Sequence, residues 1–254
     1  MKKPTFVLIS LAQRKRDLED QVTWEAYVRD PYILRLEELG LTPLLVSPAS
    51  NHETRRSLYE VASGILLTGG MDIDPKLYGA KDVHAKTKAH EGERDILELL
   101  LFDWARQGNK PVMAICRGFQ LGAIASGGVL DQHLPDSGIS EVHSAASAGY
   151  GEFMKRTPTK ISLSPESRAA KLLGKTEIYG QCAHHQAVMS VGPWMTISGR
   201  SAEGVAEVAE ANDPNFWCFL FGPHSEPNNN NDFTRAWQGF SQACYEYPRL
   251  AYSL

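Results

Sequence analysis

One cysteine of this sequence stands where a nucleophile would be expected. Cys116 directly follows the apolar run 111–115, and Arg117-Gly118 leads from it into a segment with helical spacing. A strand that turns sharply into a helix lifts the side chain at the turn out of the sheet, as in a nucleophile elbow. The helix N-terminus favours a thiolate over a thiol, and the backbone N–H of Arg117 would point outward as an oxyanion donor. The sequence therefore predicts nucleophilic chemistry at Cys116. The alternative is a buried core cysteine, which is a common structural role.

A thiol nucleophile needs a base, and the segment containing His224 and Glu226 offers one. Residues two apart in an extended segment face the same side, so the Glu226 carboxylate can orient the His224 ring. The flanking Pro223 and Pro227 stiffen this stretch. The alternative is a surface loop in which this histidine and glutamate occur by chance. The residues by themselves leave open both a Cys-His-Glu triad and a surface loop.

Strands and helices alternate along the half of the chain that contains Cys116. Strands are predicted at 5–10, 43–46, 64–67 and 111–115, and helices at 30–39 (with Asp30 as N-cap), 53–61, 91–107 and 119–125. This rhythm predicts an α/β fold with a mostly parallel central sheet and helices on both faces. Short strands near 159–163, 177–179, 194–198, 205–209 and 217–221 would extend the sheet with antiparallel pairs, and a helix over 232–245 would follow. We expect a single domain over residues 1–254.

Composition narrows the classes of protein. The net charge of −4 leaves no basic surplus for binding nucleic acid. The sequence has no apolar run of the roughly 20 residues that span a bilayer, and the short run 6–9 predicts a buried strand rather than a signal peptide. The four cysteines show no CxxC spacing, so we expect free thiols and a cytoplasmic location.

Six blocks of sequence resemble one known family. They are Thr68-Gly69-Gly70-Met71-Asp72-Ile73-Asp74-Pro75, Arg94-Asp95 with Glu98, Cys116-Arg117-Gly118 with Gln120, Gly127-Gly128, His184-His185-Gln186-Ala187-Val188, and His224-x-Glu226. In this order they resemble the class I glutamine amidotransferase-like hydrolases, and in particular the γ-glutamyl-γ-aminobutyrate hydrolase branch, peptidase family C26.

The resemblance implies a flavodoxin-like class I glutamine amidotransferase fold and a hydrolase of γ-glutamyl amides that acts through a γ-glutamyl thioester. It assigns Cys116, His224 and Glu226 to catalysis, and the amides of Gly70 and Arg117 to the oxyanion hole. The substrate-binding residues that it implies are Gly69, Gln120, His184, His185 and Gln186. It implies no cofactor and no metal, a small-molecule γ-glutamyl amide as partner, no nucleic acid or membrane partner, and a homodimer.

The sequence departs from the family pattern beside the predicted site. Gln181-Cys182 stand where the family has Asn-Ser, and Ser225 stands where it has proline. These changes leave the amine half of the substrate open. Two other functions also stay open, namely a glutaminase subunit that supplies ammonia to a separate synthetase, and a catalytically silent binding homologue.

Two further groups of residues allow a chemical and a structural interpretation. Cys182 beside His184 is a second reactive pair or, the favoured interpretation, a small buried filler. The group formed by His84, His90, Glu91 and Glu93 has irregular spacing, which favours a solvated loop and helix start over a metal site.

Overall fold

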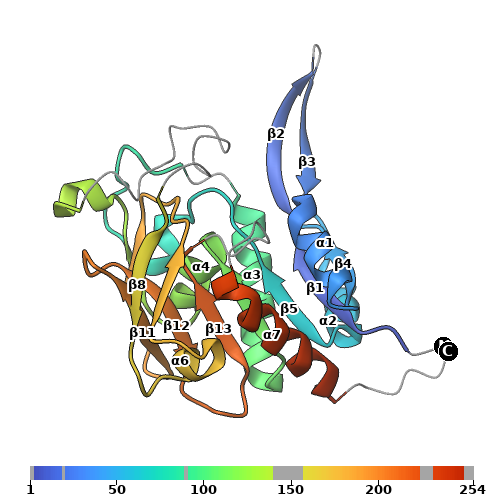
Figure 1. The fold of residues 1–254 in the computed structure, drawn as a ribbon. Helices are drawn as coiled ribbons and strands as arrows, with labels where there is room; N and C mark the ends of the chain where they lie inside the picture. The colour runs from blue at the N-terminus through green and yellow to red at the C-terminus, as the bar shows by residue number, and fades with distance from the viewer. Residues whose placement is uncertain (1–2, 19–20, 89–90, 140–156, 224–230, 249–254) are drawn as a thin grey trace.

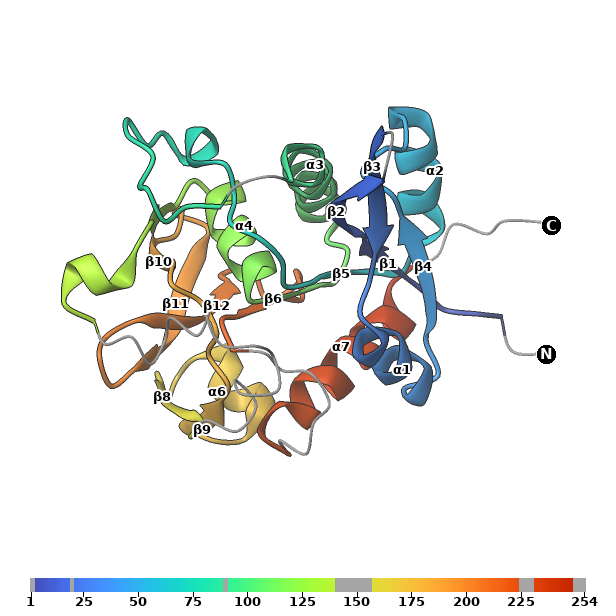
Figure 2. The same ribbon diagram turned by 90° about the horizontal axis from the view of Figure 1, so that it is seen from above.

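A large mixed sheet forms the centre of the molecule (Figures 1 and 2). The computed structural model describes residues 3–18, 21–88, 91–139, 157–223 and 231–248. Within these residues the strand order is β4-β1-β5-β6-β13-β12-β11-β8-β9, with β10 pairing with both β12 and β7. The strands are β1 (Phe6–Ser10), β4 (Thr42–Val46), β5 (Gly64–Leu67), β6 (Val112–Ile115), β7 (Val129–Asp131), β8 (Thr159–Leu163), β9 (Glu177–Gly180), β10 (Ala187–Ser190), β11 (Met195–Ser201), β12 (Ala206–Ala211) and β13 (Cys218–Phe221).

The half of the sheet that contains Cys116 is parallel. Strands β4, β1, β5, β6 and β13 pair in parallel, and all four residues of β5, β6 and β13 are buried. Parallel strands that are covered on both faces appear in sequence as continuous apolar runs, which is why they could be predicted. The carboxyl ends of β5, β6 and β13 lie at one edge, where open α/β sheets bind ligands.

Two sets of helices cover the two faces of this sheet (Figure 2). Side chains of α2 (His52–Val61), α3 (Gly92–Gly108) and α4 (Arg117–Ala125) pack in one apolar cluster with Leu8, Ile65 and Val112. Side chains of α1 (Asp30–Glu38), α6 (Arg168–Leu173) and α7 (Thr234–Glu246) pack in the other with Ile9 and Met113. The predicted α/β fold with helices on both faces is confirmed.

The second half of the chain extends the sheet with antiparallel strands, as predicted. Strand β12 pairs antiparallel with β13 and β11, and β8 pairs antiparallel with β11 and β9. Short 3₁₀ helices in the described connections are η1 (Pro75–Tyr78), η2 (Leu134–Ser137) and η4 (Asn231–Phe233).

The sequence interpretation missed a β-hairpin. Strands β2 (Ala12–Leu18) and β3 (Gln21–Tyr27) pair with each other as a separate two-stranded sheet that projects from the body (Figure 1). β2 has charged residues at four successive positions (14–17) and so lacks the period-2 pattern of a strand, although in β3 Val22, Trp24 and Ala26 do alternate with polar residues. Glu25 pairs across the hairpin with Arg14 and Arg16 on the exposed surface.

Smaller differences concern the first residues of two helices. The N-cap of α1 is Arg29 rather than the predicted Asp30, which is the first helical residue and precedes Pro31. Helix α4 begins at Arg117, two residues earlier than predicted.

Among the described residues, none of the helices combines the length and apolar character needed to cross a bilayer.

Candidate active site

The turn at Cys116 has the geometry of a nucleophile elbow. Cys116 is the N-cap of α4 with φ 55° and ψ −109°, a positive-φ conformation that residues with a Cβ rarely adopt. Its amide donates to the Phe221 carbonyl at 2.7 Å, and its carbonyl accepts from the Gln120 amide at 3.2 Å, the first bond of the helix. Such a backbone costs on the order of 1–3 kcal/mol and persists where surrounding structure enforces it. The predicted strand–turn–helix is therefore present.

Gly118 allows α4 to start directly above the neighbouring strand. A Cβ on Gly118 would lie 2.6 Å from the carbonyl oxygen of Leu67, at the end of β5. This contact is with backbone, which cannot move aside without displacing the strand. The helix can approach β5 this closely only because residue 118 has no side chain.

One cavity collects most of the residues predicted for the site. It has a volume of about 540 Å³, and its lining includes Gly70, Met71, Asp72, Lys86, Lys88, Cys116, Arg117, Gln120, His133, Pro135, Ala183, His184, His185 and Gln186. Gly69 does not line this cavity. It lines a smaller cavity together with Tyr32 and Arg29. The fold thus brings Cys116 to the same hollow as the turn after β5 and the segment before β10.

Gly70 sits between two buried arginines. A Cβ there would lie 2.2 Å from Nη1 of Arg94 and 2.8 Å from Cδ of Arg117. Arg94 also donates to the carbonyl oxygens of Thr68 and Gly69 at 3.1 and 3.2 Å, which holds the turn in place. Only glycine at position 70 leaves room for this packing.

A buried network of charges connects that turn to α4. Glu98 accepts hydrogen bonds from Arg94 at 2.7 Å, from Arg117 and from the Ser10 hydroxyl. Arg117 also pairs with Asp95. Burial raises the pKa of the Glu98 carboxyl, but the guanidiniums of Arg117 and Arg94 outweigh it and hold that pKa below its ordinary value. The network links β1, β5, α3 and α4 at the edge where Cys116 lies.

The prediction for Glu91 was wrong. A solvated helix start was expected there, whereas the Glu91 side chain is 1% exposed and pairs with Arg94 at 2.9 Å. Its partner stands three residues later in the chain, a spacing that brings two side chains onto one face of a helix.

The helix N-terminus favours the Cys116 thiolate as expected, but burial outweighs this effect. Burial raises the pKa of the Cys116 thiol to about 11, against the opposing effects of the Arg117 backbone N–H and the charges of Arg29 and Arg117. The desolvation of a buried thiolate costs more free energy than the interactions with these groups contribute. The Cys116 side chain therefore rests as a thiol, and chemistry at its sulfur would need a base to take the proton.

This resting state predicts how alkylation of Cys116 depends on pH. The rate of alkylation by iodoacetamide should rise by about tenfold per pH unit between about pH 7 and 9 without levelling off, because only the thiolate reacts and its fraction follows the raised pKa. Mass spectrometry of the modified peptide measures the rate, and Cys116→Ser gives the background from the other thiols. A rate that is already constant at pH 7 would show a thiolate formed in advance.

The segment before β10 contributes two histidines with different surroundings. His185 Nε2 lies 3.0 Å from Oδ2 of Asp72, and its Nδ1 lies 3.3 Å from Nδ1 of His133. His184 is buried, and its ring faces the Glu207 carboxylate of β12 and the Gln186 carbonyl. Gln120 donates to that same Gln186 carbonyl at 3.1 Å, so α4 holds this segment against the cavity.

Two predicted catalytic residues, His224 and Glu226, lie outside the described residues. The described chain that leads to them passes beside Cys116, because Phe221 pairs with Ile115 across β13 and β6 and Gly222 lines a small cavity with Cys116.

The sequence interpretation did not single out Glu207 or Asp72 for this site. Glu207 occupies a strand whose six residues are all buried, and an acidic residue among apolar neighbours was the available signal. Asp72 belongs to the matched Thr68–Pro75 block, but its contact with His185 depends on tertiary structure.

Comparison with solved structures defines the class of fold. A Thermoplasma acidophilum protein assigned to GMP synthase superposes with a TM-score of 0.60 over 97% of this chain and 98% of that chain, at 15% identity. A glutamine amidotransferase from Methylobacillus flagellatus superposes with a TM-score of 0.54 over 94% and 76%, at 17% identity. The fold is that of the class I glutamine amidotransferases.

Sequence comparison defines the family. Residues 7–222 match the Peptidase C26 family, and the chain belongs to it. This membership places it among the glutamine amidotransferase-like hydrolases. A protein of Mycobacterium tuberculosis named for glutamine amidotransferase activity is 34% identical over 67% of this chain, and the match spans 53% of that protein's own length. The γ-glutamyl-γ-aminobutyrate hydrolase PuuD of Escherichia coli is 26% identical over 87% of each chain.

Proposed function

We propose that this protein hydrolyses the γ-glutamyl amide bond of a γ-glutamylated amine, giving glutamate and free amine. The observation that carries the proposal is the elbow at Cys116, which presents a thiol to the 540 Å³ cavity between Gly70 and the segment of His185. The name of the similar Escherichia coli hydrolase supports the substrate class.

The proposed reaction begins with proton transfer from the Cys116 thiol to His224, which Glu226 orients. The sulfur then attacks the γ-carbonyl carbon, and the amides of Gly70 and Arg117 stabilise the oxyanion. Protonated His224 gives its proton to the departing amine as the C–N bond breaks. Water, deprotonated by His224, attacks the resulting γ-glutamyl thioester and releases glutamate and the thiol.

Charged residues in the cavity support recognition of the α-amino-acid end of a γ-glutamyl group. A γ-glutamyl group carries a free α-carboxylate and a free α-ammonium. Lys86 and Lys88 offer positive charge to the carboxylate, and Asp72 offers negative charge to the ammonium. We propose that the other predicted residues, namely Gly69, Gln120, His184, His185 and Gln186, shape the cavity around the acyl chain.

A panel of amides tests the proposed function. The amine is varied among ammonia, γ-aminobutyrate and an aromatic amine, and each γ-glutamyl amide is matched with its β-aspartyl counterpart, which is one methylene shorter. We expect glutamate release from at least one γ-glutamyl amide, faster than aspartate release by about 10-fold or more, because one methylene in a fitted pocket is worth about 1–3 kcal/mol.

The same panel separates the alternatives. If glutamine is the only amide of the panel that is hydrolysed, and only after a synthetase partner is added, the result would indicate an ammonia-supplying role. Binding of the amides without release of either amino acid would indicate a silent binding homologue. Either result contradicts the proposed hydrolase.

A further inference from the structure

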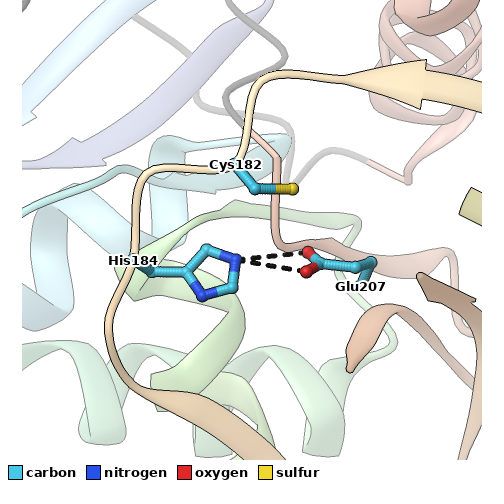
Figure 3. Close-up of side chains that lie close together, drawn as sticks. All are labelled: Cys182, His184 and Glu207. Carbon is cyan, nitrogen blue, oxygen red and sulfur yellow. Dashed lines mark hydrogen bonds and ion pairs between the residues drawn. The ribbon is translucent and has the colours of Figure 1, made fainter. Parts of the chain in front are cut away.

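A buried cluster of three potential ligands, of which only His184 lines the cavity, lies apart from the proposed triad. It consists of Cys182 and His184, which follow β9, and Glu207 of β12. One sulfur, one imidazole nitrogen and one carboxylate oxygen of these residues all lie within 4.8 Å of one another. Figure 3 shows the His184 ring facing the Glu207 carboxylate, with the Cys182 thiol beside them. The three residues are 4%, 8% and 0% exposed.

The His184 ring is oriented as in metal-bound histidines. Its Nδ1 lies 2.9 Å from the Gln186 carbonyl oxygen, which can only accept, so Nδ1 carries a hydrogen and donates. Its Nε2 is thereby directed at Glu207. A histidine that ligates a metal through one nitrogen commonly donates its other N–H to a backbone carbonyl, which orients the ring.

The spacing of His184 and Glu207 also suits a tetrahedral ion, and the Cys182 sulfur lies within 4.8 Å of both. Zinc ligands lie about 2.0–2.3 Å from the metal, so two of them are roughly 3.3–3.7 Å apart. His184 Nε2 lies 3.3 Å from both Glu207 oxygens. A sulfur, an imidazole nitrogen and a carboxylate oxygen are each zinc ligands.

We propose that Cys182, His184 and Glu207 form a binding site for a divalent ion of the zinc class. Cys182 releases its proton to solvent on binding, and the resulting thiolate and the Glu207 carboxylate together neutralise the two positive charges of the ion. Neutrality matters because the site is buried. The three protein ligands leave one tetrahedral position open, and His184 lines the cavity through which the ion reaches the site.

The site is specific to this chain's own residues. Cys182 is one of the positions at which the sequence departs from the family pattern, so the family resemblance does not imply it. The site also brings a metal close to the nucleophile, because His184 and Cys116 line the same small cavity.

The test uses the full chain with Cys116→Ser, so that the nucleophile cannot act as a ligand and the result does not depend on amidase activity. After treatment with a chelator, the protein is titrated with zinc chloride by calorimetry and with cobalt chloride by absorption spectroscopy. We expect one ion per chain and a cobalt–thiolate charge-transfer band. Adding Cys182→Ser should remove the band and weaken zinc binding by about 100-fold or more.

Two further variants serve as the matched control and the second ligand test. Cys244→Ser removes another buried thiol, on α7, and should leave metal binding unchanged. Glu207→Gln keeps the side-chain volume and should weaken zinc binding, and circular dichroism of the metal-free variants checks folding. The proposal is overturned if Cys182→Ser and Glu207→Gln leave the zinc affinity unchanged. It is also overturned if the chain binds zinc only when Cys116 is present.

Discussion

Replacing Cys116 with alanine should lower kcat for a γ-glutamyl amide by about 10⁶-fold, the order of loss seen when a hydrolase loses its nucleophile. The elbow places this thiol, rather than any of the three other cysteines, at the edge of the sheet beside the cavity. Without its sulfur no thioester can form, and the remaining groups can only orient substrate and stabilise an oxyanion. Released glutamate, followed at saturating substrate, measures the loss.

The matched control for this variant is Cys244→Ala. Cys244 is also a buried free cysteine, but it packs in the apolar cluster between α7 and the sheet. Its replacement should leave kcat within a few-fold, although a small cavity will lower stability. Circular dichroism and urea unfolding establish that both variants fold. Normal turnover by folded Cys116→Ala would refute the assignment of the nucleophile.

Replacing Glu98 with alanine should lower the free energy of unfolding by about 3–5 kcal/mol, because it leaves buried positive charge without its partner. The Glu98 side chain is fully buried and accepts from both Arg94 and Arg117. Urea unfolding near pH 7 measures the change. Since the same carboxylate holds the turn at Gly70 and the start of α4 in place, activity should fall even where the variant is still folded.

Two other variants show whether the charge of Glu98 is responsible. Glu98→Gln keeps the volume and should recover only part of the lost stability, because an amide can replace one hydrogen bond but not the charge. Glu60→Ala removes an exposed partner of Arg56 on α2 and should cost about 0–1 kcal/mol. Equal costs for Glu98→Ala and Glu60→Ala would show that the buried network does not stabilise the fold.

Local sequence pattern determined the part of the fold that carries Cys116. The runs at Gly64–Leu67 and Val112–Ile115 are apolar at every position, and the glycine two residues after Cys116 marks the tight strand-to-helix turn. These features depend on neighbours in sequence. The pattern did not reveal the hairpin of β2 and β3, because the four successive charged residues of β2 hide its strand character.

Charge states and long-range contacts were decided by tertiary structure alone. A helix N-terminus predicts a thiolate at Cys116, yet the depth of burial reverses that preference. Glu91 appears in the sequence as part of a polar helix start, and it is the packing of α3 against the sheet that encloses it with Arg94.

By itself, then, the sequence was enough to predict an α/β fold with a strand–turn–helix at Cys116, because such a turn has a local sequence pattern. The junction of Cys182 and His184 with Glu207, 23 residues beyond His184, could not be predicted in this way. It arises where the segment after β9 crosses β12, and such a crossing follows from strand order in the sheet rather than from the residues next to each ligand.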